Sequence, residues 1–276
     1  MDLSKMQFDI IVVAGQSNAQ GMGKSHDKKP IIVDDVYEAL DFNPVVFVND
    51  DNGKYLRLDV KMPPEVTIQN LQEGLGDNGY YYCDMSISFV ESYLKNRPIA
   101  KGRNLIVIKS AIGGTGFALN QQGVGNVVYE RSVKMTNYVL SLNKNNRIVA
   151  FLWHQGEHDA FEKPEMDNES RYIFYYNKLK EQLLDFRNKF SRFKFPIIAG
   201  SMCDEWKNTL LEKCLIIEKA TKDVLTEIGY SGYVDLSGLK SNNQEFNDGD
   251  TIHFSKNSQQ IIGKRYFDKF KEIVDE

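Results

Sequence analysis

The sequence predicts a three-layer α/β/α sandwich around a parallel sheet, and three observations lead to this fold class. Short apolar runs recur along the 276-residue chain, and several are continuous blocks of Val, Ile, Leu and Phe with no polar face. Such blocks are typical of strands covered on both sides. Longer segments with helical spacing separate them. Because alternating strands and helices build right-handed βαβ units, we expect helices on both faces of the sheet.

The strands are expected where the apolar runs lie, at residues 8–14, 45–48, 105–110, 148–153 and 196–200. The run at 45–48 is ambiguous, because Pro44 precedes it and Asn49-Asp50-Asp51 follows it, and these residues fit a loop equally well.

Three helices are predicted between and after these runs. An apolar stripe with alternating spacings of four and three residues predicts a helix over residues 170–190, with Ser170 as its N-cap. A shorter stripe predicts a second helix over residues 129–142. The last helix is expected to follow Ser255 and to continue close to the end of the chain.

The composition is that of a globular protein, with 42% hydrophobic and 26% charged residues. The 34 Lys and Arg residues against 38 Asp and Glu residues give a net charge of −4, so a nucleic-acid partner is not expected. Three cysteines are an odd number without the spacing of metal ligands, which excludes a disulfide framework as the organising principle. No cysteine metal site is therefore expected, and no cofactor is expected either, because no G-x-G-x-x-G motif follows the first predicted strand.

We expect a single domain over residues 1–276, with loop insertions at residues 26–79 and 237–250. Both segments lack a helical or strand period, and prolines are scattered through the first. The apolar run at residues 10–14 is too short to cross a membrane and leads into Gly15-Gln16-Ser17-Asn18 without a cleavage pattern. No signal peptide and no membrane contact are therefore expected, and the protein is either cytoplasmic or exported by a route that the sequence does not display.

Polar and glycine residues follow the predicted strands at the edge where ligands bind in an open parallel sheet. The three segments at strand ends are Gly15-Gln16-Ser17-Asn18, residues 111–116 and residues 154–159, and Asp250-Thr251-Ile252-His253 precedes the last helix. Together they supply a serine, a histidine, carboxylates, amides and backbone N–H groups that glycine leaves accessible.

This inventory fits nucleophilic catalysis by a serine. Ser17 is positioned to act as the nucleophile, His253 is the best base, and Asp250 lies three residues before it, within reach of its ring. The Ser17 N–H, a glycine N–H from residues 113–116 and the Gln155 amide could stabilise a tetrahedral oxyanion.

At these residues the chain resembles the SGNH hydrolase superfamily, and most closely its carbohydrate esterase branch of sialate O-acetylesterases and acetylxylan esterases. Four motifs carry the resemblance, in the family's order and spacing, between residues 10 and about 267. They are Gly15-Gln16-Ser17-Asn18, Gly113-Gly114-Thr115, Trp153-His154-Gln155-Gly156-Glu157-x-Asp159 and Asp250-x-x-His253-Phe254.

The resemblance implies a flavodoxin-like sheet and metal-free ester hydrolysis, with Ser17 as nucleophile, His253 as base and Asp250 as the residue that orients it. It also implies an oxyanion hole formed by the Ser17 and Gly114 N–H groups and the Gln155 amide. The family resemblance further suggests that Gln16, Asn18 and Glu157 support the site or contact substrate. Glu157 is similar to a family glutamate that supports the histidine or touches substrate, so the acid that orients His253 is left open between Asp250 and Glu157.

Three positions depart from the family pattern. Ala19 stands where methionine is common, His158 stands where serine is common, and residues 117–120 lack a tryptophan that commonly follows the GGT motif. Because that tryptophan lies near the substrate in the family pattern, the sugar preference is not carried over. The expected partner is an O-acetylated carbohydrate such as sialic acid, xylan or another acetylated glycan.

Two alternatives remain at this point. His154 and His158 with Glu157 match the H-x-x-E-H spacing of zinc peptidases, which requires both histidines on one helix face, and Gly156 opposes a helix there. A non-catalytic carbohydrate-binding module on the same fold is the other, although the chain retains Ser17, Asp250 and His253. The sequence thus favours a serine esterase that removes O-acetyl groups through an acetyl-serine intermediate.

Overall fold

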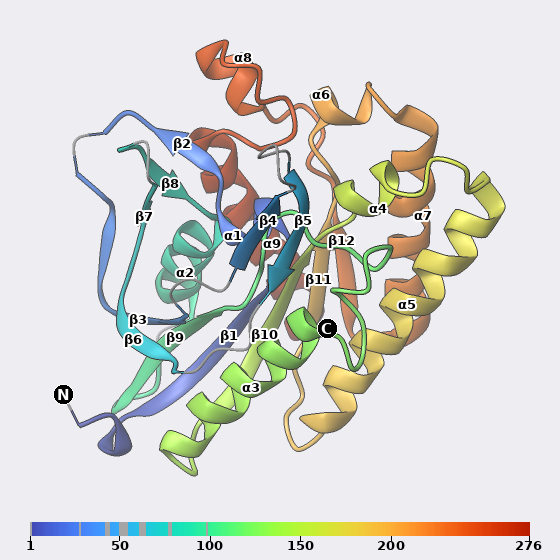
Figure 1. Ribbon diagram of the computed structural model, residues 1–276. Coiled ribbons are helices and arrows are strands. Elements are labelled where there is room, and N and C mark those ends of the chain that lie inside the picture. Colours follow the sequence, from blue (N-terminus) through green and yellow to red (C-terminus); the bar gives the residue numbers. More distant parts are fainter. Residues whose placement is uncertain are drawn as a thin grey trace.

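The computed structural model describes residues 2–27, 29–41, 65–76, 79–97 and 99–276, together with the backbone of residues 45–49 and 55–60 (Figure 1). Within these residues, a seven-stranded sheet forms the centre of the molecule. Its strands, from edge to edge, are β12 (Ser231–Val234), β11 (Ile197–Gly200), β10 (Arg147–His154), β1 (Gln7–Gly15), β9 (Arg103–Lys109), β3 (Ile32–Leu40) and β6 (Thr67–Gln72). Neighbouring strands run parallel except β6, which is antiparallel to β3.

Strand β1 lies in the middle of the sheet and pairs with β10 on one side and β9 on the other. Its apolar run is continuous because both faces are covered: Ile10 and Val12 enter one core, and Ile11 and Val13 enter the other. The chain changes direction across the sheet at β1, and this is the position where ligands bind in open α/β sheets.

Among the described residues, five long helices cover the two faces of the sheet (Figure 1). Three of them pack on one face: α3 (Val127–Leu142), α5 (Asn168–Lys189) and α7 (Leu211–Ile228). On the other face lie α2 (Met85–Asn96) and α9 (Lys256–Asp275). The predicted three-layer α/β/α sandwich is thereby confirmed. In the described part of the chain, no helix combines the length and the apolar character needed to cross a membrane.

The part of the chain that the structure describes also has four short helices near the carboxyl ends of the strands and a 3-10 turn before β1. They are α1 (Ser17–Gln20), α4 (Glu157–Phe161), α6 (Asp204–Lys207) and α8 (Asn242–Phe246), and the turn is η1 (Leu3–Lys5). Helix α8 is the one regular element within residues 237–250, for which the sequence predicted a loop insertion.

Of the two N-caps predicted from the sequence, Ser255 is confirmed and Ser170 is wrong. Ser255 is the N-cap of α9, as predicted, and its side chain accepts a hydrogen bond from the Ser258 N–H. Helix α5 instead begins at Asn168, because Asp167 is its cap and accepts from the Ser170 N–H at 2.8 Å. Ser170 therefore lies inside the first turn, which corrects its assignment as the cap.

Residues 26–79, interpreted from sequence as a loop insertion, contribute two strands to the central sheet. The sequence signal of β3 is masked because its buried Glu38 pairs with Lys109 of β9 at 2.8 Å, and because a register shift accompanies the positive φ of Asp35. The remaining strands form two small sheets, β2 (Gly23–Ser25) with β8 (Tyr81–Cys83) and β7 (Gly74–Leu75), and β4 (Val45–Asn49) with β5 (Tyr55–Val60). The predicted strand at 45–48 thus exists but lies outside the central sheet.

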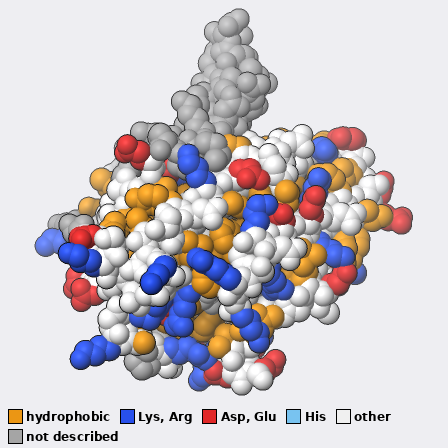
Figure 2. Space-filling view, turned by 90° about the horizontal axis from the view of Figure 1, so that it is seen from below, with side chains coloured by type: hydrophobic (Ala, Val, Ile, Leu, Met, Phe, Trp, Pro, Cys, Tyr) orange, Lys and Arg blue, Asp and Glu red, His pale blue; other side chains and the backbone are white. Residues whose placement is uncertain are grey.

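The amino ends of the central strands form the end of the molecule opposite α1 and α8. Figure 2 looks onto this end, where Lys and Arg side chains gather across the middle of the face. At the start of the strands, the buried Asp9 of β1 lies 2.6 Å from Arg103 and 2.7 Å from Arg147. These ion pairs link the beginnings of the three neighbouring strands β10, β1 and β9.

Two glycines permit close approaches that no other residue would allow. Gly15 has a φ of +129°, and a Cβ there would lie 2.0 Å from the His154 carbonyl oxygen, so β1 can turn into α1 directly beside β10. A Cβ at Gly263 of α9 would lie 2.1 Å from the Ser88 hydroxyl of α2. The first contact sets the geometry of the site, and the second sets the packing of the two helices.

Candidate active site

Ser17 is the first residue of α1, immediately beyond the carboxyl end of β1, and only 7% of its surface is exposed. A Cβ at Gly113 would lie 3.3 Å from the Ser17 Cβ, so the Gly113-Gly114 loop passes directly against the serine. The Ser17 hydroxyl makes no hydrogen bond to any residue in the described part of the chain. The hydroxyl is therefore held at the sheet edge without a partner that would have to be displaced.

His253 and Asp250 form a pair in the loop before α9. The His253 Nδ1 lies 2.9 Å from Asp250 Oδ1 and 3.1 Å from Oδ2, and the His253 N–H donates to Oδ1 at 3.2 Å. Burial alone would raise the pKa of Asp250, but the hydrogen bond and charge of His253 outweigh it and hold that pKa well below its usual range. Asp250 is thus an anion that holds Nδ1 as the protonated nitrogen, leaving Nε2 as the acceptor.

Asn18 connects α1 to the loop that carries His253. Its side-chain nitrogen donates to the Ile252 carbonyl at 3.1 Å, and its side-chain oxygen accepts from the Phe254 N–H at 3.0 Å. One amide therefore holds the residues on both sides of His253. Ser17 is next to Asn18 in the chain, so this amide fixes the histidine loop relative to the serine.

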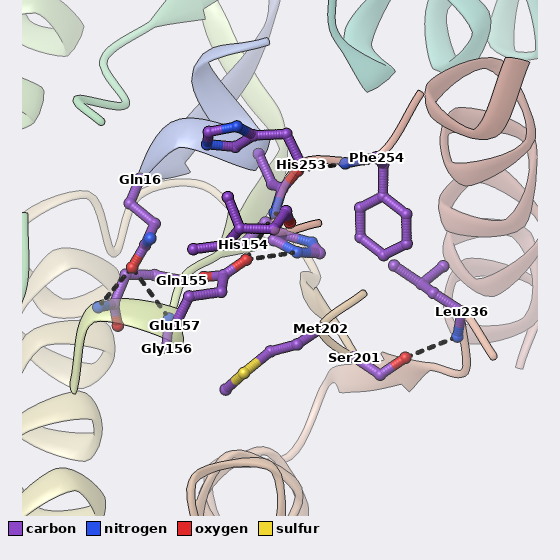
Figure 3. Close-up of polar contacts among 12 residues, drawn as sticks. Gln16, His154, Gln155, Gly156, Glu157, Ser201, Met202, Leu236, His253 and Phe254 are labelled. Carbon is purple, nitrogen blue, oxygen red and sulfur yellow. Dashed lines mark hydrogen bonds and ion pairs between the residues drawn. The ribbon is translucent and has the colours of Figure 1, made fainter. Parts of the chain in front are cut away.

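Glu157 contacts Asn18 and His154, and not the ring of His253. Its Oε1 accepts from the Asn18 side chain at 2.7 Å and lies 3.6 Å from His154 Nε2 (Figure 3). Burial would raise the pKa of Glu157, but the His154 and Asn18 contacts lower it below its usual range. Of the two acids considered from sequence, Asp250 is the one that contacts His253, and Glu157 supports Asn18.

Gln155 directly follows β10, and its amide lies among polar groups of three other segments. Its amide nitrogen lies 2.6 Å from Asp159 Oδ2, 3.1 Å from Gln16 Oε1 and 3.4 Å from the Thr115 carbonyl oxygen. The role of Gln155 as an oxyanion donor stays a prediction.

Gln16 lies between the ends of β1 and β10. Its side-chain oxygen accepts from three donors, the Gln155 amide and the N–H groups of Gly156 and His158 (Figure 3). Gln16 is 2% exposed, and its backbone N–H donates to the His154 carbonyl at 3.0 Å. Gln16 therefore links the turn that carries Ser17 to the start of α4.

Two backbone N–H groups beside Ser17 have no acceptor among the described residues. They belong to Ser17 itself, at the start of α1, and to Gly114, whose φ is +69°. The Gly113 N–H, in contrast, donates to the Gln20 side chain at 2.7 Å. N–H groups without an acceptor, at a helix start and in a glycine turn, can donate hydrogen bonds to an oxygen on which negative charge develops.

The histidine pair of the zinc alternative is divided between two elements. His154 is the last residue of β10 and lies 3.1 Å from the Tyr266 hydroxyl, whereas His158 belongs to α4 and lies 3.2 Å from Glu162. The two imidazoles therefore do not share one helix face, which that chemistry requires.

A cavity of about 760 Å³ opens next to the far end of α1. Gln20, Ala111 and Ile112 lie on its side nearest Ser17, and Lys109 lies on its wall between two buried carboxylates. Lys109 Nζ is 2.8 Å from Glu38 and 2.7 Å from Asp84. The cavity thus has a polar wall in which these charges are already paired.

Sequence reasoning missed three supporting residues. Gln20 holds the Gly113 N–H, Asn242 donates to Asp250 Oδ2 at 2.9 Å, and Tyr175 of α5 donates to Gln155 Oε1 at 2.9 Å. For Asn242 the sequence does carry a signal. Ser241 and Gln244 have the spacing of a capping box, which marks the start of α8 at Asn242.

A family model described as carbohydrate esterase, sialic acid-specific acetylesterase matches residues 7–272. No curated protein matches the chain significantly.

Two solved structures share the fold. The crystal structure of NanS is similar with a TM-score of 0.72 and 14% sequence identity, covering 98% of this chain and 97% of NanS. A carbohydrate esterase family 2 enzyme with a carbohydrate-binding domain, from Corynascus thermopiles (Myceliophthora fergusii), is similar with a TM-score of 0.51 and 11% identity, covering 99% of this chain and 67% of that one. At these identities the likeness concerns the fold, whereas the family match spans nearly the whole chain. The chain therefore belongs to the family of carbohydrate esterases described as sialic acid-specific acetylesterases, and it is a carboxylic ester hydrolase.

Proposed function

We propose that the chain hydrolyses O-acetyl esters of a carbohydrate with Ser17 as nucleophile, His253 as general base and Asp250 as the residue that orients it. The observation that carries the proposal is the Asp250–His253 pair at 2.9 Å, in a loop that the side chain of Asn18, the residue after Ser17, binds on both sides of His253. A nucleophile, a base and a carboxylate that orients the base are the parts that acyl transfer requires.

The reaction begins when the Ser17 hydroxyl attacks the acetyl carbonyl carbon and its proton passes to His253 Nε2. The carbonyl electron pair moves onto oxygen, and the Ser17 and Gly114 N–H groups stabilise the resulting negative charge by donating hydrogen bonds to it. The C–O bond to the sugar then breaks, and the sugar oxygen takes the proton from His253. Water repeats the same steps on the acetyl-serine and releases acetate. The Ser17–His253 hydrogen bond forms with substrate bound, as apo hydrolases often lack it.

The cysteines support the choice of serine. Cys83, Cys203 and Cys214 are buried, and burial raises the pKa of Cys203 to about 11 and that of Cys214 to about 12. Thiols with such pKa values carry almost no thiolate at neutral pH, and the thiolate is the nucleophilic form.

The sugar is proposed to occupy the cavity beside α1. A volume of about 760 Å³ suits a monosaccharide or a short glycan, and the polar wall around Gln20 and Gln72 offers partners for hydroxyl groups. O-acetylated sialic acid, acetylated xylan and other acetylated glycans are the candidates.

Acetate release from p-nitrophenyl acetate and from a panel of these glycans tests the proposal. We expect Ser17→Ala and His253→Ala to lower kcat by about a thousandfold or more, since each removes an essential member of the triad. Unchanged activity in either variant would overturn the assignment, and binding without release of acetate from every glycan would favour a binding module. Activity that a chelator removes and zinc restores would favour the metal alternative.

A further inference from the structure

The cavity beside α1 has charged side chains in its wall. Among the described residues that line it, the carboxylates are Glu38, Asp41, Glu73 and Asp84, and the cations are Lys109 and Arg131. This cavity is the proposed sugar site, so a charge on the sugar would meet these groups. Whether the cavity can accept such a charge depends on how the cations of the wall are already paired.

Lys109 of β9 is held by two carboxylates at once. Its Nζ lies 2.8 Å from Glu38 Oε2 and 2.7 Å from Asp84 Oδ2, and it donates to the Gln72 carbonyl at 3.3 Å. Glu38 and Asp84 are buried, so both ion pairs are shielded from solvent and salt. An ammonium group has three N–H bonds, and those of Lys109 face three acceptors of the protein.

Arg131 of α3 is also paired within the wall. Its Nε lies 3.4 Å from Asp41 Oδ2, and its Nη1 donates to the Ser110 carbonyl at 3.1 Å. Both side chains of this pair are almost completely buried, so the charge of the guanidinium is balanced inside the protein. In the part of the chain that the structure describes, each cation of the cavity wall thus has a carboxylate of its own.

The wall carries an excess of negative charge. Glu73 is balanced from outside the cavity lining by Lys256 of α9, whose Nζ lies 2.8 Å from Glu73 Oε1. The excess lies where Glu38 and Asp84 share the single ammonium group of Lys109. A further carboxylate that enters the cavity loses water, gains no unpaired cation among the described lining residues and meets this negative charge.

The rest of the lining fits an uncharged sugar. Tyr81 and Tyr82 of β8 contribute aromatic surface, and Gln20 and Gln72 contribute amide groups. A sugar ring presents apolar C–H groups as well as hydroxyl groups, and a pocket with apolar surface and a few polar groups suits both. Sugar hydroxyl groups can also donate hydrogen bonds to carboxylates, so the charges of the wall do not oppose a neutral sugar.

We propose that the cavity selects O-acetylated sugars without a carboxylate, and that Glu38, Lys109 and Asp84 together exclude acidic sugars. This inference rests on the proposed hydrolysis of carbohydrate O-acetyl esters and names the substrate class of that reaction. The matching family model is described by sialic acid, which is a sugar acid. At the sugar, this chain therefore departs from the description of its family, whereas the steps at Ser17 remain the same.

A matched pair of substrates isolates the charge of the sugar. The methyl glycoside of O-acetylated N-acetylneuraminic acid and its methyl ester carry the same acetyl group on the same sugar and differ by one carboxylate. We expect kcat/KM for acetate release to be about tenfold or more higher for the methyl ester. Acetate alone is measured, so cleavage of the methyl ester itself does not enter the comparison. Equal values, or a preference for the acid, would overturn the inference.

The same comparison can be made if neither member of the pair is cleaved. The acid and its methyl ester are then tested as inhibitors of acetate release from acetylated xylo-oligosaccharides, and we expect the methyl ester to bind about tenfold more tightly. Equal inhibition by the two would count against the inference. If p-nitrophenyl acetate is cleaved and no acetylated sugar is, the cavity does not receive a sugar and the inference is wrong.

Asp84→Asn assigns the selectivity to the wall. Asparagine is as good an N-cap as aspartate, so it can replace Asp84 at the start of α2, and Lys109 keeps its pair with Glu38. We expect the ratio of kcat/KM between methyl ester and acid to fall about threefold or more, because the excess negative charge is removed. Both substrates are measured on one preparation, so a loss of folded protein leaves the ratio unchanged. A ratio equal to that of the parent would refute the role of this group.

Asp223→Asn is the matched control, because it removes the same charge from an exposed pair with Lys219 on α7, outside the cavity lining. Its ratio should stay within about twofold of the parent, since solvent and salt screen a distant exposed charge. An equal fall in both variants would mean that overall charge, and not the wall, sets the preference. Ser17→Ala separates the two proposals. An active Ser17→Ala enzyme refutes the serine mechanism, whereas an inactive one with a parent that cleaves acid and ester equally refutes the charge selection alone.

Discussion

The Asn18 side-chain oxygen accepts a hydrogen bond from the Phe254 N–H at 3.0 Å, joining positions 236 residues apart in the chain. The nitrogen of the same amide holds the Ile252 carbonyl at 3.1 Å, so both neighbours of His253 are fixed by one side chain of the serine helix. Asn18 thus fixes the loop that carries His253 relative to the turn that carries Ser17.

Replacing Asn18 tests whether activity depends on the hydrogen bonds that hold the loop of His253. We expect Asn18→Ala to lower kcat about 100-fold, because a displacement of about 1 Å in a catalytic group has an effect of that size. Kinetics with p-nitrophenyl acetate measure the loss, and circular dichroism checks that the fold is retained. An Asn18→Ala enzyme with kcat within twofold of the parent would show that the histidine loop keeps its place without this amide.

Asp250 should stay ionised throughout the pH range in which esterases are assayed, because its pKa is held well below its usual range. We therefore expect Asp250→Asn to lower kcat across the whole profile, since the carboxylate that orients the imidazole is lost at every pH. Kinetics with p-nitrophenyl acetate from about pH 5 to about pH 9 measure this effect. A kcat equal to that of the parent at any pH in this range would contradict the proposed role of Asp250.

The same shift has a consequence for stability. A carboxyl group whose pKa is depressed on folding stabilises the folded state above its unfolded pKa of about 3.9, and this contribution is lost as the pH falls through the folded value. Thermal unfolding should therefore show Asp250→Asn as less stable than the parent near pH 7, with the difference shrinking below about pH 4. A difference that stays constant down to pH 2 would argue against the contact.

Lys109 should be essential for the stability of the cavity wall. Burial alone would lower the pKa of Lys109, but the charges of Asp84 and Glu38 outweigh it and raise the pKa, so this lysine is a cation between two buried carboxylates. Lys109→Met leaves both carboxylates unpaired, and we expect the free energy of unfolding to fall by about 3–5 kcal/mol. Urea denaturation measures it. Lys219→Met, which removes an exposed pair with Asp223 on α7, is the control, and the two variants should differ clearly.

Gly263 should be required for the packing of α9 on α2. A Cβ there would lie 2.1 Å from the Ser88 hydroxyl and 2.2 Å from the Met85 carbonyl oxygen. We expect Gly263→Ala to lower the free energy of unfolding by about 1–3 kcal/mol through overpacking. Gly74→Ala is the matched control, since nothing lies within 4 Å of its added Cβ. Equal midpoints for the two variants in urea would contradict the close contact.

The sequence predicts the centre of the sheet well and its outer strands poorly. β1, β9 and β10 are covered on both faces, so their apolar runs are continuous and easy to detect. β3 is hidden because Glu38 is buried in it, and a buried carboxylate is tolerated there only through Lys109, about 70 positions away in the chain. Local patterns do not reveal a partner at that distance.

The site could be predicted as a set of residues but not as a network. Parallel strands end at the same edge, so the segments after β1, β9 and β10 had to meet there. The hydrogen bonds of Gln155 depend instead on partners from other elements, such as Asp159 of α4 and Tyr175 of α5. Residue type and spacing along the chain do not reveal such partners.

The bond between Asn18 and Phe254 also bears on the order in which the site is assembled during synthesis. The ribosome adds Phe254 236 residues after Asn18. Contacts this distant in the chain are slow to form. A nascent chain can therefore assemble strands of its central sheet before Asn18 meets the loop that carries His253, and the proposed site is completed only after that loop has been made.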